Sequence, residues 1–362
     1  MSNHDSTSAH LERKVNKRVE WLDLARGATI ILVVFLHSSH TASVIGPINE
    51  TVRWLNTNLL LDLRMPLFFF CSGVLGYWGL RKPWRTVAVS RFRVLIWIIF
   101  AWTLISFGLE RLIDLYPQYD GLHHWSRLFW DPISNLWFVY AILIISLIIR
   151  LVSSFRRRHQ VSIVAGINIG LMILVQFGPT VIANSFVQQL PDYALLSFFT
   201  GYLFAPNVVS SLERLRNAFV SFGIGVTCWF AVNLIDTLIA TTNVNLIRFI
   251  YSIPMIFMAL GLARLICEWT WGANKLSWLG KRTLEVFLFH QIFIAVGFAM
   301  LVELGITSGT LALFFISGFA LCGSILAERI TKYLGLSILF QPPAIQGWAR
   351  KFSLQLKSHE AR

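Results

Sequence analysis

The sequence predicts an all-α polytopic membrane protein with about ten transmembrane helices. Hydrophobic residues make up 56% of the 362-residue chain and charged residues only 14%, a balance typical of membrane proteins. The mean hydropathy is +0.63. Windows of about 20 apolar residues recur along the chain, and each is long enough to cross a hydrocarbon core of about 30 Å. No segment between them is long enough to form a separate soluble domain.

The chain is expected to consist of one membrane domain between two polar tails. We expect a cytoplasmic N-terminal tail over residues 1–22, a transmembrane domain over residues 23–335 and a basic cytoplasmic C-terminal tail over residues 336–362. The polar N-terminal residues are not followed by a short apolar segment with a small-residue cleavage site. The first span is therefore expected to be a retained anchor rather than a cleaved signal.

Ten apolar segments are candidates for the spans. They cover residues 24–44, 58–80, 94–112, 135–152, 161–182, 193–204, 218–239, 246–266, 283–304 and 309–328. The sixth segment is short for a transmembrane helix, and Pro254 is expected to interrupt the eighth. Residues 81–93 are expected to form a basic loop. We find no internal repeat, which weakens the case for an inverted-repeat transporter.

The distribution of positive charge predicts the orientation of the chain. Of the 31 Lys and Arg residues, all but five lie in segments that ten spans would place on the same side as both termini. Cytoplasmic segments carry such an excess, so both termini are expected to be cytoplasmic. This bias also explains the net charge of +13 without a nucleic-acid partner. The five exceptions are Arg53, Arg64, Arg111, Arg127 and Arg248.

The remaining polar features predict no metal or disulfide site. The four cysteines fall in apolar spans and form no C-x-x-C pair. The long loop over residues 113–133 is rich in aromatic, acidic and histidine residues, and these could bind a saccharide. An interfacial aromatic belt explains its tryptophans equally well. His123 and His124 lie near aspartates, but no spacing supports a defined metal site.

Two ionisable residues in the first span are the sharpest candidates for chemistry. Arg26 and His37 are eleven residues apart, which places both on one helix face about 16 Å apart along the axis. The imidazole of His37 can take up a proton near neutral pH, as a general base must. The planar guanidinium of Arg26 suits a phosphate group. Asp23 lies one turn earlier and could instead simply pair with Arg26.

Two further polar residues are expected inside the membrane. His290 lies about 12 Å inside the ninth span, a depth at which it could meet His37 in one cavity. A hydrogen-bonded core histidine is an equally good interpretation of His290. Arg64 lies within the second span and requires a carboxylate, backbone carbonyls or a wet cavity. We expect Arg64 to line a cavity.

Three arginines near the first cytoplasmic loop form a candidate donor site. Arg85, Arg91 and Arg93 lie close together in the sequence beside the start of the third span. Several guanidinium groups beside a helix end could hold a phosphorylated donor. For any one of them, ordinary topology charge is the better interpretation.

The ordered set of these motifs resembles the membrane acyltransferase-3 family. The resemblance begins with WLDLARG and the R-x10-H pair of Arg26 and His37. It continues through nearly the whole membrane region in RMPLFFFCSG (residues 64–73), SRFR (90–93), NLWFVYAIL (135–143) and WLGKRTLEVFLFHQ (278–291). Each motif alone is weak, and their conserved order makes the set fairly specific.

The resemblance implies an integral membrane O-acyltransferase of carbohydrates. Such enzymes have about ten helices and commonly move acetyl from cytoplasmic acetyl-CoA to hydroxyls of extracytoplasmic or lipid-linked saccharides. It implies catalytic roles for Arg26, His37 and His290, and we add Arg64. Arg26 is expected to help bind the donor, together with Arg85, Arg91 and Arg93.

The same resemblance implies the surroundings in which the chain works. No permanently bound cofactor is expected, and acetyl-CoA or another acyl-CoA is the donor substrate. The expected partners are a carbohydrate acceptor, polyprenyl-linked or free, membrane lipids and polysaccharide-assembly proteins. The expected location is a bacterial inner membrane.

The sequence departs from the family pattern at two places. Arg64 stands where many relatives have histidine, which puts a histidine-based role there in doubt. Glu285 and Phe287 replace a serine- and tyrosine-rich sequence.

A saccharide or lipid transporter is the main alternative function, because polar groups at depth and a broken eighth helix would permit it. A structural partner in an envelope-assembly complex is a further alternative.

Overall fold

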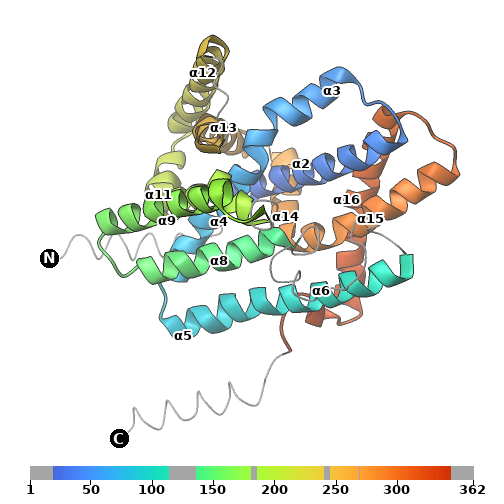
Figure 1. Cartoon of the computed structure of the whole chain (residues 1–362), viewed down its shortest axis with the longest axis horizontal. Coiled ribbons are helices and arrows are strands. Elements are labelled where there is room, and N and C mark those ends of the chain that lie inside the picture. Colours follow the sequence, from blue (N-terminus) through green and yellow to red (C-terminus); the bar gives the residue numbers. More distant parts are fainter. Residues whose placement is uncertain (1–18, 114–135, 181–185, 240–244, 269, 344–362) are drawn as a thin grey trace, which may run out of the picture.

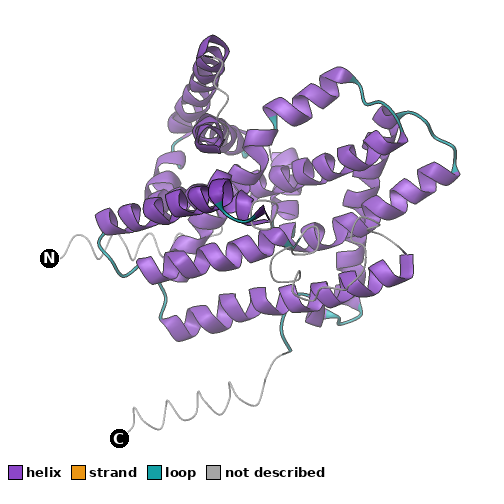
Figure 2. Ribbon diagram, in the orientation of Figure 1, coloured by secondary structure: helices purple, strands orange, loops and turns teal. Residues whose placement is uncertain are grey.

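The protein is helical throughout the part that the structure describes. The computed structural model describes residues 19–113, 136–180, 186–239, 245–268 and 270–343 (Figure 1). Figure 2 shows only helices and loops in this part, which confirms the all-α prediction. The aromatic loop of residues 114–135, most of the N-terminal tail and residues 344–362 lie outside the described residues.

The described helices include three short π-helical turns. In chain order the elements are α2 (Glu20–Ile45), α3 (Glu50–Trp54), η1 (Leu55–Leu59), α4 (Leu61–Leu80), α5 (Trp84–Val87), η2 (Ala88–Phe92), α6 (Arg93–Ile113), α8 (Trp137–Val152), α9 (Arg157–Phe177), η3 (Phe186–Gln188), η4 (Leu190–Ala194), α11 (Leu195–Leu212), α12 (Leu215–Ile239), α13 (Asn245–Ile266), α14 (Thr270–Gly280), α15 (Thr283–Glu303), α16 (Gly309–Tyr333) and η5 (Ser337–Leu339). The π-helical turns are η1, η2 and η4.

Nine helical segments of the described residues are long and apolar enough to cross a membrane. The helix α8 is a shorter apolar helix of 16 residues. A polytopic membrane protein with about ten spans is therefore confirmed. The side of the membrane on which the termini lie stays a prediction.

Several expected boundaries were wrong. Pro254 does not interrupt its span, because α13 continues through it. The expected basic loop after α4 is largely helical, and α5 and η2 run directly into α6. The sixth span is not short, because an apolar helical segment runs over Phe186–Leu212. Local composition missed these continuations, since a basic or proline-containing stretch can remain helical where it packs against other helices.

The helix α2 packs closely against several later elements, above all α14 and α16. A Cβ atom on Gly27 would lie 2.1 Å from the carbonyl oxygen of Leu276, and one on Gly280 would lie 1.7 Å from that of Asp23. Only glycine permits this backbone contact between α2 and α14. Arg26 is adjacent to this contact, so its surroundings are set by the close packing.

A second close contact joins α4 to α11. A Cβ atom on Gly73 would lie 2.0 Å from the carbonyl oxygen of Phe198, and one on Gly201 would lie 2.1 Å from that of Phe70. Small residues at helix interfaces allow this approach in membranes, where packing replaces the hydrophobic driving force.

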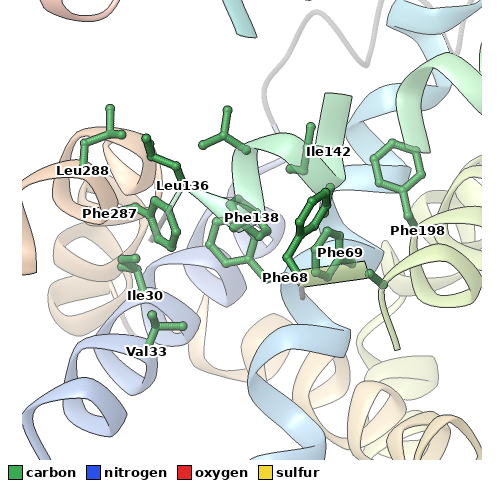
Figure 3. Close-up of a cluster of buried hydrophobic side chains, with 14 of the residues drawn as sticks. Ile30, Val33, Phe68, Phe69, Leu136, Phe138, Ile142, Phe198, Phe287 and Leu288 are labelled. Atoms are coloured by element: carbon green, nitrogen blue, oxygen red, sulfur yellow. The ribbon is translucent and has the colours of Figure 1, made fainter. Parts of the chain in front are cut away.

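Aromatic side chains connect α4 and α11 to the rest of the core. The ring of Phe138 on α8 lies 4.7 Å from that of Phe68 and 5.0 Å from that of Phe69. Phe287 on α15 lies 5.1 Å from the same ring. These side chains converge between α4, α8 and α15 (Figure 3).

The helices α12 and α13 lie at one edge of the molecule, at the upper left of Figure 1. The helix α12 packs mainly on α13, whereas α13 also packs on α4 and α2. Most of the side chains on α12 are not buried, in contrast to those of α4. This edge is therefore the part of the described fold that depends most on the surrounding membrane.

We predict that Gly73→Ala destabilises the fold and that Gly79→Ala does not. Both glycines lie on α4, but a Cβ on Gly79 meets nothing within 4 Å. Overpacking at Gly73 is expected to cost about 1–3 kcal/mol. Alanine at position 79 should be neutral or stabilising by about 0.5–1 kcal/mol. Thermal unfolding of the two variants in one detergent measures the difference, and equal melting temperatures would contradict the contact.

Candidate functional site

The candidate site lies between α2 and α15. Arg26 and His37 lie on α2, and each meets a residue of α15: Thr283 for Arg26 and His290 for His37. Residue numbers increase in the same direction along both helices between these two contacts. The two helices therefore run parallel, and α15 contributes a partner at each of two depths about 10 Å apart.

The two histidine rings face each other inside the bundle. Their centroids lie 5.3 Å apart, and the ring planes are inclined by 51°. His290 is fully buried, whereas His37 is only partly buried. No hydrogen bond joins the His37 ring to any residue that the structure describes. The ring of His40 lies farther from His37, at 6.4 Å, and His40 is exposed.

The hydrogen bond of His290 defines its tautomer. Its Nδ1 lies 2.6 Å from the carbonyl oxygen of Phe287, which can only accept a hydrogen bond. Nδ1 therefore carries the proton, and Nε2 of the neutral ring carries a lone pair. Within the described part of the chain this buried Nε2 has no hydrogen-bond partner. It is thus available to accept a proton or a hydrogen bond from a group that enters the site.

Arg64 is held by Asn56 from the preceding π-helical turn. Its Nη1 donates to the Asn56 side-chain oxygen, and its Nη2 donates to the Asn56 backbone oxygen over 2.6 Å. Asn56 Nδ2 in turn donates to Ser39 Oγ on α2 over 2.7 Å. All three residues are buried. Arg64 is only 1% exposed, and its charge is met by amide and carbonyl groups. The expectation that it lines a cavity stays a prediction.

This network brings a fixed positive charge to the histidine pair. The guanidinium of Arg64 lies within electrostatic range of His37 and His40. Asp62 of α4 and Tyr193 of η4 in turn lie within electrostatic range of Arg64. Two of the five N–H donors of Arg64 are used by Asn56, so the group is oriented but not saturated.

Arg26 is paired on both sides. Its Nη2 donates to Thr283 Oγ1 over 2.6 Å, and its Nη1 lies 3.6 Å from a carboxylate oxygen of Asp23. Pairing with Asp23 was one of the two expected interpretations. The guanidinium remains partly exposed, with 19% of the side chain accessible. A phosphate could therefore still approach it.

An ion-pair network fixes the first turn of α15 to the last turns of α16. Arg282 Nε lies 3.3 Å from Glu328, and Lys332 contacts Glu328 closely. Lys332 also lies 3.8 Å from Glu285. Glu285 thus belongs to this network rather than to the histidine pair.

The three arginines expected near the donor differ in their surroundings. Arg85 and Arg93 are exposed on α5 and α6. Arg91 lies in the π-helical turn η2, where its Nε donates to buried Ser146 over 3.1 Å and its guanidinium lies 5.9 Å from the ring of Phe198. Of the three, Arg91 is the one that packs against the neighbouring helices α8 and α11.

Sequence reasoning missed the π-helical turns, and with them Asn56 and Asp192. Each turn carries a buried or partly buried polar side chain: Asn56 in η1, Arg91 in η2 and Asp192 in η4. Such turns widen a helix locally and occur frequently at functional sites. No sequence motif marks them, so Asn56 could have been found only from the requirement that a buried Arg64 needs an acceptor. Among the described residues, no group of three His, Cys, Asp or Glu side chains could hold a metal.

We predict that Asn56→Ala destabilises the protein more than Asn168→Ala. Both asparagines are buried, with 2% and 3% exposed. Asn168 donates only to the sulfur of Met172, whereas Asn56 satisfies a buried charge. Loss of a hydrogen bond to a charged group typically costs about 1.5–3 kcal/mol. Thermal unfolding in detergent should show the larger loss for Asn56→Ala, and the reverse order would exclude a structural role for the network.

Comparison with known proteins agrees with this arrangement. Residues 19–329 match the model of the acyltransferase-3 family, which is described as an acyltransferase domain. No curated protein matches the chain, and no solved structure matches it. The family match covers most of the chain, including α2, α4 and α15 with the histidine pair. The chain therefore belongs to the membrane acyltransferase-3 family.

Proposed function

We propose that the protein is a membrane O-acyltransferase that moves an acyl group, acetyl in the first instance, from cytoplasmic acyl-CoA to a saccharide hydroxyl. Family membership supports acyl transfer in a membrane. The donor, the acyl group and the acceptor are our proposals. We place the reaction at a bacterial inner membrane, with a cell-surface or lipid-linked saccharide as acceptor. The observation that carries the proposal is the pair of facing histidines inside the helical bundle.

His37 is proposed as the general base. A saccharide hydroxyl is a weak nucleophile, and removal of its proton during attack accelerates acyl transfer. The ring of His37 is partly accessible and has no hydrogen bond to a described residue that would occupy its nitrogens. The lone pair on His290 Nε2 provides a second proton acceptor. The centroids of the His290 and His37 rings are 5.3 Å apart.

The reaction can be written with these groups. The hydroxyl oxygen attacks the thioester carbonyl carbon, and its proton passes to His37. The C–S bond then breaks, and the thiolate of CoA leaves and takes the proton from His37, which restores the neutral base. The oriented charge of Arg64 would stabilise the negative charge that develops on the carbonyl oxygen. A direct transfer between two bound substrates and an acyl-His37 intermediate are both compatible with this arrangement.

The donor is proposed to approach the arginines at the ends of the helices. Arg26 is partly exposed beside Thr283, and Arg91 is directed toward α8 and α11. Guanidinium groups present several N–H donors in one plane, which suits the oxygens of a phosphate. Arg85 and Arg93 are exposed and can add to the local positive charge.

One of the two observations that favoured a transporter is wrong. The transporter alternative rested partly on an eighth helix broken at Pro254, but α13 is continuous through this residue. Broken helices are where many transporters bind their substrates. No other feature of the described residues favours transport over transfer.

We predict that His37→Ala abolishes acyl transfer and that His40→Ala does not. Loss of a general base is expected to lower the rate by about 10²–10⁴-fold. His40 lies on the same helix one turn away, but it is exposed and farther from the pair. Its loss should change the rate by less than about threefold, because it is not proposed to handle the proton. Release of free CoA from acetyl-CoA by purified protein, with a saccharide acceptor, measures both rates.

A complementation experiment tests the same proposal in cells. A deletion strain is complemented with the wild type, His37→Ala or His40→Ala at matched expression, and O-acetyl groups on surface glycans are quantified. Restoration by the wild type and His40→Ala, but not by His37→Ala, would support both the reaction and its base. Unchanged glycan acetylation in the deletion strain would contradict acetyl transfer to glycan.

A further inference from the structure

A cavity of about 600 Å³ lies away from the histidine pair, between α11, α12 and α13. None of its lining residues belongs to α2 or α15. Its walls are mostly apolar and include Phe204 of α11, Ile224 of α12 and Phe257 of α13, while Phe70 of α4 closes one side. Its size falls in the range of small-molecule pockets, about 300–1,000 Å³.

The cavity opens toward the membrane. Several of its apolar wall residues are also exposed on the outer surface of the helices, at 42% for Phe204, 51% for Ile224 and 48% for Phe257. All three lie in segments long and apolar enough to span a bilayer. A molecule can therefore enter from the side, between helices, and its buried part must be hydrocarbon-like.

The length of the cavity matches a lipid chain. Ser211 and Ser197 both line it and are fourteen residues apart on α11. At 1.5 Å per residue they are separated by about 21 Å along the axis. Half of a hydrocarbon core is about 15 Å. The cavity thus extends from the turn between α11 and α12 through at least one leaflet.

The end of the cavity at this turn is polar, and two arginines of the turn lie next to its lining residues in the sequence. Asn217 and Ser211 line it, and Asn217 Nδ2 donates to the Ser211 backbone oxygen over 2.9 Å. The helix α12 begins at Leu215, so its free N–H groups lie at this end and favour an anion. Arg214 and Arg216 are exposed here, and neither forms an ion pair with a residue that the structure describes.

Few acidic groups of the described residues lie near this positive charge. Arg264 donates to the Leu212 backbone oxygen and pairs with Glu268 at 2.5 Å, so that carboxylate is already neutralised. Glu213 is the one acidic residue within the turn itself. Two arginines and a helix N-terminus therefore face a single carboxylate.

We propose that this cavity binds one fatty-acyl chain of an anionic phospholipid whose phosphate lies at the N-terminus of α12. The apolar walls take the chain, and Asn217, Arg214 and Arg216 surround the head group. The lipid fills the space between α11 and α12, which contact each other far less than α12 contacts α13. It thus stabilises the exposed edge of the fold, independently of the acyl transfer proposed above.

The test uses a matched pair of isoleucines on α12. Ile224 lines the cavity and is 51% exposed, whereas Ile235 does not line it and is 53% exposed. Full-length wild type, Ile224→Trp and Ile235→Trp are purified in detergent and incubated with isotope-labelled phosphatidylglycerol. Lipid retained per chain after size-exclusion chromatography is measured as a function of lipid concentration. Val220→Trp serves as a second cavity-filling variant if Ile224→Trp does not run as a single folded species.

The wild type and Ile235→Trp are expected to retain one lipid per chain, and Ile224→Trp is expected to weaken binding about tenfold or more. The double variant Arg214→Gln/Arg216→Gln should lose most of the preference for phosphatidylglycerol over phosphatidylcholine. Added phosphatidylglycerol should raise the melting temperature of the wild type but not of Ile224→Trp.

Three results would overturn the proposal. Retention that does not saturate would show that no defined site exists. Equal retention by Ile224→Trp and Ile235→Trp would place the lipid elsewhere. Displacement of bound phosphatidylglycerol by a lower concentration of polyprenyl phosphate would assign the cavity to an isoprenoid chain instead.

Discussion

The rest of the site depends on how one buried arginine is satisfied. Arg64 lies inside the membrane bundle, where an unpaired charge is costly, and no carboxylate of the described residues is hydrogen-bonded to it. Asn56 meets the charge with two oxygens and passes a hydrogen bond on to Ser39 of α2. Because Ser39 lies two residues after His37, the same network that makes Arg64 tolerable also fixes the helix that carries the proposed base.

The parallel arrangement of α2 and α15 explains why two distant sequence motifs form one site. Arg26 meets Thr283 and His37 meets His290, so the register of one helix against the other is set at two depths. The glycine contacts between α2 and α14 lie next to Arg26 and fix the contact of Arg26 with Thr283. In the predicted orientation of the chain, this contact is the one nearer the cytoplasm. A shift of either helix by one residue would separate both pairs, since each residue adds about 1.5 Å and 100°.

Sequence reasoning predicted those features of the site that follow from helix periodicity and from the depth of a residue within its span. The spacing of Arg26 and His37 predicted a shared face, and the depth of His290 predicted its proximity to His37. It missed Asn56 and the burial of Arg91, because both lie in π-helical turns that change the helix register locally. Pro254 shows the converse, since an intrinsic helix breaker is tolerated inside α13, which packs closely on α12 at Gly225. Sequence periodicity therefore predicts which residues share a helix face, whereas tertiary contacts decide whether a helix continues through an unfavourable residue.

The position of His37 also bears on where transfer would occur. His37 lies about 16 Å along α2 from Arg26, which is about half of a 30 Å hydrocarbon core. A base at mid-depth suits a reaction whose donor and acceptor arrive from opposite sides, because neither substrate then has to cross the whole membrane. In the proposed reaction Arg26 would lie at the donor end of this path, and the polar segment from Ser38 to His40 would lie at the acceptor end. The buried charge of Arg64 sits beside the midpoint, where negative charge would develop during transfer.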